Sequence, residues 1–288
     1  MTKSLLMNNL GKADNEKVQY VGFDCQNNSY NPGLLQDYLT QANAPFLTYA
    51  KSILNAPELS GNYNTEASFG EYLKSLDNLL DTMVLYKPQL ISASSEKKYL
   101  LYEQILKIIK QVSMVDYFSK EGNDTYRDKF MADNAIWIHD YFDGKKTVIW
   151  AHNAHILNGY LYDTGNMGNY LTKSLSTNYV PIGFLFSKGY FNAFNILYNG
   201  LFKQEINTEP LASSVNYLMS CSKASVFSVN VADLQKYNDW DYELSHSLRY
   251  LNIGATYNSR PDDWYYNFSP AFFNYLIYFD NTTASTLL

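Results

Sequence analysis

The sequence predicts an α/β fold, with a largely parallel sheet flanked by helices and a helical insertion or cap. Short runs rich in β-branched and aromatic residues alternate with longer stretches of helical spacing, as in strands joined by crossover helices. Of the 288 residues, 46% are apolar and 17% are charged. This is the balance of an ordinary globular protein that buries a sizeable core.

The runs predicted to be strands are short, apolar and followed by polar side chains. We expect strands at 18–23, 147–150, 180–186, 225–231 and 276–279. Asp24 and Asp280 directly follow the first and the last of them. Because α/β proteins bind ligands beyond the carboxyl ends of their strands, these polar ends predict the place of a site.

Helical spacing is found at 34–54, 66–86, 96–118, 125–142 and 168–176. The stretch 55–120 contains no convincing strand, and a loop rich in Asn, Gly, Pro and Ser leads into it. We therefore predict three regions. Residues 1–54 begin the α/β core, 55–120 form the helical insertion or cap, and 121–288 complete the core.

Composition excludes several classes of function. A net charge of −6 without a basic cluster argues against nucleic-acid binding. No apolar stretch approaches the roughly 18 residues that span a bilayer. Cys25 and Cys221 form no CxxC motif, so neither a disulfide framework nor a zinc–thiolate site is expected. Residues 1–10 lack a signal-peptide pattern, which favours a cytoplasmic location unless a targeting signal precedes them. Oligomeric state leaves no mark in the sequence.

A histidine pair follows the run 147–150 in the stretch "VIWAHNAHI" (148–156). His152 and His155 are three residues apart, so a helix or a loop can direct both into one cleft. They could pack, bind a metal or act as acid and base near neutral pH. Asn153 could donate to a developing oxyanion or hold a histidine ring. A metal site needs a third ligand, which is not found nearby, so we expect no catalytic metal.

The helix predicted at 125–142 carries a second group of candidates. Thr125 and Asp128 are spaced as in a capping box, which places Arg127 in the first turn, where the helix dipole disfavours a positive charge. Arg127 could hold an anionic or carbonyl oxygen of a substrate, or simply pair with Asp124 or Asp128. We predict His155, His152 and Arg127 as catalytic residues.

The other three candidates are predicted to bind substrate: Asp24, Asn153 and Asp128. Asp24 could instead cap the segment that follows it. We expect His152, His155 and Arg127 to converge on one cleft, with Asp24 nearby.

Taken in order, these stretches resemble the erythromycin esterase family. The matching pieces are "VQYVGFDCQ" (18–26), "YRDKFMADNAIWI" (126–138), "VIWAHNAHI", "MGNYL" (167–171), "YVPIGFLFSKGYFNAF" (179–194), "SLRYLNIGATYN" (247–258) and "YLIYFDNTTAS" (275–285). The resemblance implies an α/β core with helical additions. It also implies hydrolysis of a small-molecule ester or macrolide lactone by histidine-assisted attack of water, with no serine nucleophile, metal or organic cofactor.

The sequence departs from this family in one place. The family's principal base belongs to a Gly-Glu-x-x-His-Gly segment near the start of the protein, and these 288 residues contain no His-Gly pair. We therefore expect a weak ester hydrolase at most, with strands that lack their neighbours and lower stability or pairing with another chain. Two alternatives stay open: a non-catalytic binding module that keeps the cleft, and a metal-dependent hydrolase that uses the histidine pair.

Overall fold

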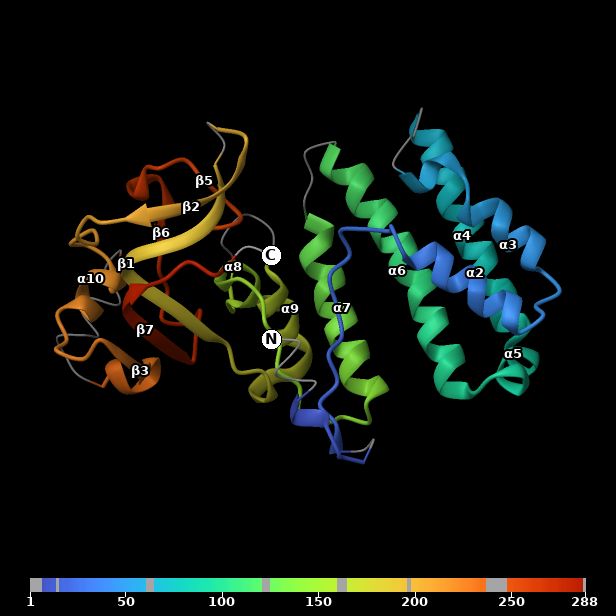
Figure 1. The fold of residues 1–288 in the computed structure, drawn as a ribbon, viewed down its shortest axis with the longest axis horizontal. Coiled ribbons are helices and arrows are strands. Elements are labelled where there is room, and N and C mark those ends of the chain that lie inside the picture. Colours follow the sequence, from blue (N-terminus) through green and yellow to red (C-terminus); the bar gives the residue numbers. More distant parts are fainter. Residues whose placement is uncertain are drawn as a thin grey trace. The chain divides into compact units, whose positions relative to one another are not determined.

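The chain forms two compact units, Met1–Thr147 and Val148–Leu288, each with its own packing (Figure 1). The structure is a computed structural model that describes residues 7–13, 16–60, 65–120, 125–159, 165–195, 198–236 and 248–286. None of the described helices is long and apolar enough to cross a membrane.

The first unit is built from helices. They are α2 (Asn31–Gln41), α3 (Leu47–Leu54), the 3-10 helix η2 (Pro57–Ser60), α4 (Glu66–Leu85), α5 (Lys87–Ala93), α6 (Glu96–Lys120) and α7 (Thr125–Tyr141). The predicted helices at 66–86, 96–118 and 125–142 are confirmed as α4, α6 and α7. The stretch 34–54 is two helices because Asn43 turns the chain with a positive φ of 48°, and Pro45 disfavours a helical Ala44.

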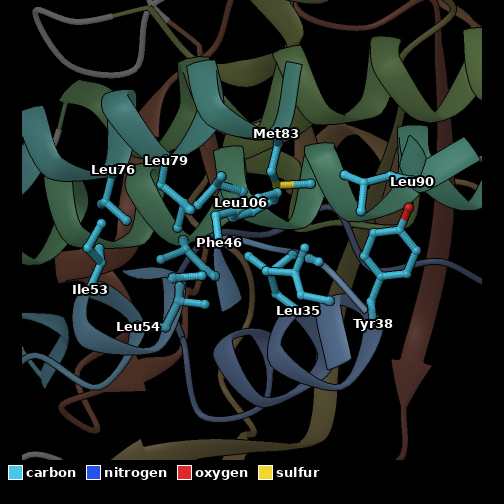
Figure 2. Packing of buried hydrophobic residues seen from close by; sticks show 14 of the residues in the cluster. Leu35, Tyr38, Phe46, Ile53, Leu54, Leu76, Leu79, Met83, Leu90 and Leu106 are labelled. Atoms are coloured by element: carbon cyan, nitrogen blue, oxygen red, sulfur yellow. The ribbon is translucent and has the colours of Figure 1, made fainter. Parts of the chain in front are cut away.

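One apolar core joins most of these helices. Leu76, Leu79 and Met83 recur at a spacing of three or four residues on α4, so they share one face of the helix, and that face is buried. Leu35 of α2 and Leu106 of α6 meet them in the same cluster (Figure 2). Whether 55–120 is an insertion with boundaries of its own stays a prediction.

The second unit combines strands with short helices. Its helices are α8 (Asn153–Ile156), α9 (Met167–Leu175), η3 (Ser176–Asn178), α10 (Val215–Ser220), α11 (Val231–Leu234) and η4 (Pro261–Trp264). Its strands are β1 (Ile182–Asn195), β2 (Gly200–Ile206), β3 (Val226–Asn230), β4 (Arg249–Leu251), β5 (Thr256–Tyr257), β6 (Tyr265–Asn267) and β7 (Tyr275–Thr282). The strands predicted at 180–186, 225–231 and 276–279 correspond to β1, β3 and β7, and the helix predicted at 168–176 corresponds to α9.

The sheet is mixed, with the order β2-β1-β7-β3 and with β5 also paired to β1. β1 runs parallel to β7 and β5, whereas β1–β2 and β3–β7 are antiparallel. β4 and β6 form a separate antiparallel pair. The α/β class is thus confirmed, but a largely parallel sheet is not. The short connection from β1 to β2 explains part of the difference, because a hairpin joins only antiparallel strands.

Two predicted strands, 18–23 and 147–150, are not strands in the structure. Both segments are described, and neither pairs with a strand in the described part of the chain. Val148 and Trp150 keep 85% and 69% of their surface exposed. A β-rich composition favours a strand only where a neighbour supplies backbone hydrogen bonds and packing. The described residues supply neither segment with a pairing strand.

Candidate functional site

His152 is the N-cap residue of α8, and both of its ring nitrogens make hydrogen bonds. Nδ1 accepts from the backbone N–H of Ala154 at 3.2 Å. Nε2 lies 2.6 Å from the carbonyl oxygen of Ile253. A carbonyl only accepts and a backbone N–H only donates, so Nε2 carries the proton and the imidazole is neutral.

The surroundings of His152 favour this neutral form. Burial lowers the pKa of His152 below its ordinary value; the hydrogen bond to Ile253 opposes this shift, and the nearby His155 adds to it. A second proton would have to enter at Nδ1, where it would break the cap of α8. His152 therefore holds the loop in place, and neither of its ring nitrogens is open to a reactant.

The side chain of Asn153 fastens α8 to β1. Its Nδ2 donates to the carbonyl of Phe184 at 2.7 Å, and its Oδ1 accepts from the N–H of Phe184 at 3.0 Å. The amide thus pairs with β1 as a neighbouring strand would. Both of its polar atoms are used in this way, so Asn153 positions the loop.

Residues at the ends of α9 and η3 donate hydrogen bonds to the rest of the loop. Asn166 donates to the carbonyl of Ala154, and Tyr179 donates to that of Ile156 at 2.6 Å. At Gly168 an added Cβ would lie 2.1 Å from the Ile156 carbonyl oxygen, so only glycine permits this approach. The short helix that carries His155 is therefore a rigid support, and His155 itself is half-buried.

In the first unit, Arg127 forms a two-point ion pair with Asp24. Nε donates to Oδ1 at 3.1 Å, and Nη2 donates to Oδ2 at 2.8 Å. Burial alone would lower the pKa of Arg127, but Asp24 and Asp128 outweigh it and raise the pKa. Arg127 thus pairs with a carboxylate 103 residues away. The sequence had suggested a substrate oxygen, or the nearby Asp124 or Asp128, as its partner.

Cys25 lies beside this pair and is fully buried. Its thiol points to the carbonyl oxygen of Arg127 at 3.9 Å. Burial, with the charge of Asp24, raises the pKa of Cys25 to about 12. The thiol is therefore protonated and unreactive at neutral pH.

The predicted site residues fall into two groups. Asp24, Arg127 and Asp128 belong to the first unit, and His152, Asn153 and His155 belong to the second. Their convergence on one cleft stays a prediction. No group of three His, Cys, Asp or Glu residues that could hold a metal ion occurs among the described residues.

Several residues that build the site were not predicted. Ile253, Asn166, Tyr179 and Gly168 all hold the α8 loop. Three of them lie within the stretches "MGNYL", "YVPIGF" and "SLRYLNIG", and Asn166 directly precedes the first. Gly168, in the first turn of α9, was the one available signal, because a glycine inside a helix can indicate a close approach of backbone.

Comparisons with known proteins point to one family and one fold. The profile described as Erythromycin esterase matches residues 6–282. None of the curated proteins matches the sequence. A solved Bacillus cereus protein is 19% identical with a TM-score of 0.82, covering 98% of this chain and 70% of that chain.

Two further solved structures share the fold. A succinoglycan biosynthesis protein is 20% identical with a TM-score of 0.69, covering 98% of this chain and 69% of that chain. A mutant of the erythromycin esterase EreC, in its open conformation, is 13% identical with a TM-score of 0.65. That comparison covers 96% of this chain and 71% of that chain.

Proposed function

Because the chain belongs to the erythromycin esterase family, we propose that it hydrolyses an ester or lactone of a small molecule by histidine-assisted attack of water. Family membership makes the chain a hydrolase in general terms. Ester hydrolysis, the residues that perform it and independence from a metal are the finer parts of the proposal.

His155 is the residue to which we assign the proton transfer. The observation that carries this choice is the use of both His152 nitrogens, to Ala154 and to Ile253. A base needs a nitrogen within hydrogen-bond reach of water, which His152 does not offer. His155 stands one turn further on the same clamped helix. A neutral imidazole there would take a proton from the attacking water and return it to the leaving alkoxide.

Arg127 is the residue to which we assign binding of a substrate oxygen. Its guanidinium carries more N–H donors than the pairing with Asp24 uses. Asp24 orients the group, and the remaining donors suit a carbonyl or anionic oxygen. Asp128 adds negative charge near Arg127. We propose that this charge supports the guanidinium; contact of Asp128 with substrate stays a prediction.

The experiment that tests this function is a hydrolysis screen with simple aryl esters and with macrolides, read by mass spectrometry. From an aryl ester we expect acid and alcohol in equal amounts, and from a macrolide lactone one ring-opened hydroxy acid. We expect no covalent adduct on the intact protein, because water attacks directly. Ligand binding without turnover would favour a binding module. A stable acyl adduct on the protein would overturn the water mechanism.

A further inference from the structure

We infer that Asn134 is a positioning residue, which fixes the backbone at Phe23 so that Asp24 meets Arg127. The inference rests on the proposed function only where it assigns a substrate oxygen to Arg127. The contacts that place Asp24 stand apart from any activity.

The amide of Asn134 lies at the centre of a buried polar network. Its Nδ2 donates to the carbonyl of Phe23 at 3.0 Å and to Oε1 of Gln111 at 2.9 Å. Its Oδ1 accepts from Nε2 of Gln104 at 2.9 Å. The Phe23 carbonyl only accepts, so it determines which end of the amide faces it. Asn134 is only 1% exposed, so water does not replace these partners.

The segment around Asp24 needs such a tie. It forms neither a helix nor a strand and pairs with no strand in the described part of the chain, so side chains must hold it. Within the segment the side chain of Cys25 is buried, and further along Asn28 donates to the carbonyl of Ile109 at 3.1 Å. The contact of Asn134 with Phe23 is the polar tie next to Asp24 on its N-terminal side.

The spacing on α7 makes the two contacts cooperate. Asn134 and Arg127 are seven residues apart, which is two helical turns, so they share one face of α7. Asn134 holds the backbone of residue 23 from that face, and Arg127 takes the carboxylate of residue 24. Without the hydrogen bond from Asn134 to Phe23, the backbone at residue 23 is less restrained. The carboxylate of Asp24 then spends less time in the position that pairs with Arg127.

Cys25 provides a readout that needs no substrate. The sequence contains two cysteines, of which Cys25 is buried and Cys221 is exposed. We would measure alkylation of each by iodoacetamide at pH 7.5, with Cys221 as the internal reference. If Asn134 holds the segment, Asn134→Leu releases it, and Cys25 becomes accessible. We expect alkylation of Cys25 to be roughly tenfold faster than in the natural sequence.

The matched control is Gln104→Leu. Both variants break the bond between Gln104 and Asn134, but only the Asn134 variant breaks the contact with Phe23. Gln104→Leu is therefore expected to leave the alkylation of Cys25 within about threefold of the natural rate. Equal acceleration in the two variants would overturn the inference.

A second control, Leu79→Ala, shows whether faster alkylation of Cys25 reflects only a loss of overall stability. This substitution leaves a cavity in the core of the same unit and destabilises it without touching Asn134 or Phe23. The two variants are compared under conditions in which their thermal midpoints are equal. Cys25 must then be alkylated faster in Asn134→Leu than in Leu79→Ala, and equal rates would overturn the positioning role. Should Asn134→Leu not fold, Asn134→Asp takes its place. Its carboxylate still accepts from Gln104 but cannot donate to Phe23.

The link to function is tested on an ester that the chain hydrolyses. Asn134→Leu is expected to raise KM roughly tenfold with kcat nearly unchanged, because Arg127 loses its orientation. Faster alkylation of Cys25 with an unchanged KM would support the positioning role. That result would overturn the assignment of Arg127 to substrate.

Discussion

Two substitutions of His152 distinguish the contributions of its two hydrogen bonds to stability. An asparagine at 152 keeps an acceptor for the N–H of Ala154, since asparagine is a favourable N-cap, but loses the donor to the Ile253 carbonyl. An alanine loses both. A lost cap costs about 1 kcal/mol, and an unsatisfied, partly buried carbonyl costs about 1 to 2 kcal/mol. We expect His152→Asn to lower the free energy of unfolding by about 1 to 2 kcal/mol, and His152→Ala by about 2 to 3 kcal/mol.

The cost of His152→Asn should depend on pH in a definite direction. Burial lowers the pKa of His152 in the folded state, so the unfolded chain binds the proton more tightly. The stability that comes from neutral His152 is complete above its ordinary pKa of 6.5. It is lost as the pH falls from there to the lower pKa of the folded state, by at most about 1.4 kcal/mol per pH unit. The advantage of the natural sequence over His152→Asn therefore narrows in acid.

Urea denaturation at pH 7.5 and pH 5.5, followed by tryptophan fluorescence, measures these differences, and the imidazole ¹⁵N shifts report the tautomer. An advantage that stays constant or grows in acid would refute the neutral, doubly bonded His152. So would a proton on Nδ1, or equal stability of the Asn and Ala variants.

Three further results are expected. Gly168→Ala places a Cβ 2.1 Å from the carbonyl oxygen of Ile156 and 2.3 Å from that of Leu157; thermal denaturation should show a loss of about 3 kcal/mol or more, and an unchanged midpoint would disprove the close approach. Arg127→Lys removes the two-point pairing with Asp24, so KM for an ester should rise roughly tenfold with kcat kept; an unchanged KM would rule out a role in substrate binding. Exhaustive chelation should leave ester hydrolysis intact, and recovery on added zinc would reveal a metal enzyme.

The helices and the buried strands were predictable because local pattern determines them. Leu76, Leu79 and Met83 mark the buried face of α4 before any neighbour is known. The direction of strand pairing is different, because it depends on what each strand meets. The runs 18–23 and 147–150 have the composition of strands. Whether such a run becomes a strand depends on a pairing strand elsewhere in the fold, which its own composition does not reveal.

The residue types of the site were predictable, but their roles were not. The position of the histidine pair after an apolar run indicated a functional loop. Nε2 of His152 is engaged by the carbonyl of Ile253, 101 residues away. Every residue has a backbone carbonyl, so the sequence does not indicate which one will be the partner. Likewise Asp24 and Arg127 were both candidates, but their pairing crosses 103 residues. The sequence predicted Asp24 near Arg127, but only the folded chain shows that the two side chains form an ion pair.

The central claim is that His152 holds the loop while His155 handles the proton. The most direct measurement is kcat/KM for one activated ester with His155→Asn and His152→Asn, both at pH 8 and with thermal midpoints recorded. We expect His155→Asn to lose roughly 10² to 10⁴ in kcat/KM while it remains folded at the assay temperature. His152→Asn should lose stability but keep kcat/KM within about tenfold. Full turnover by His155→Asn, or the larger catalytic loss in His152→Asn, would contradict the account.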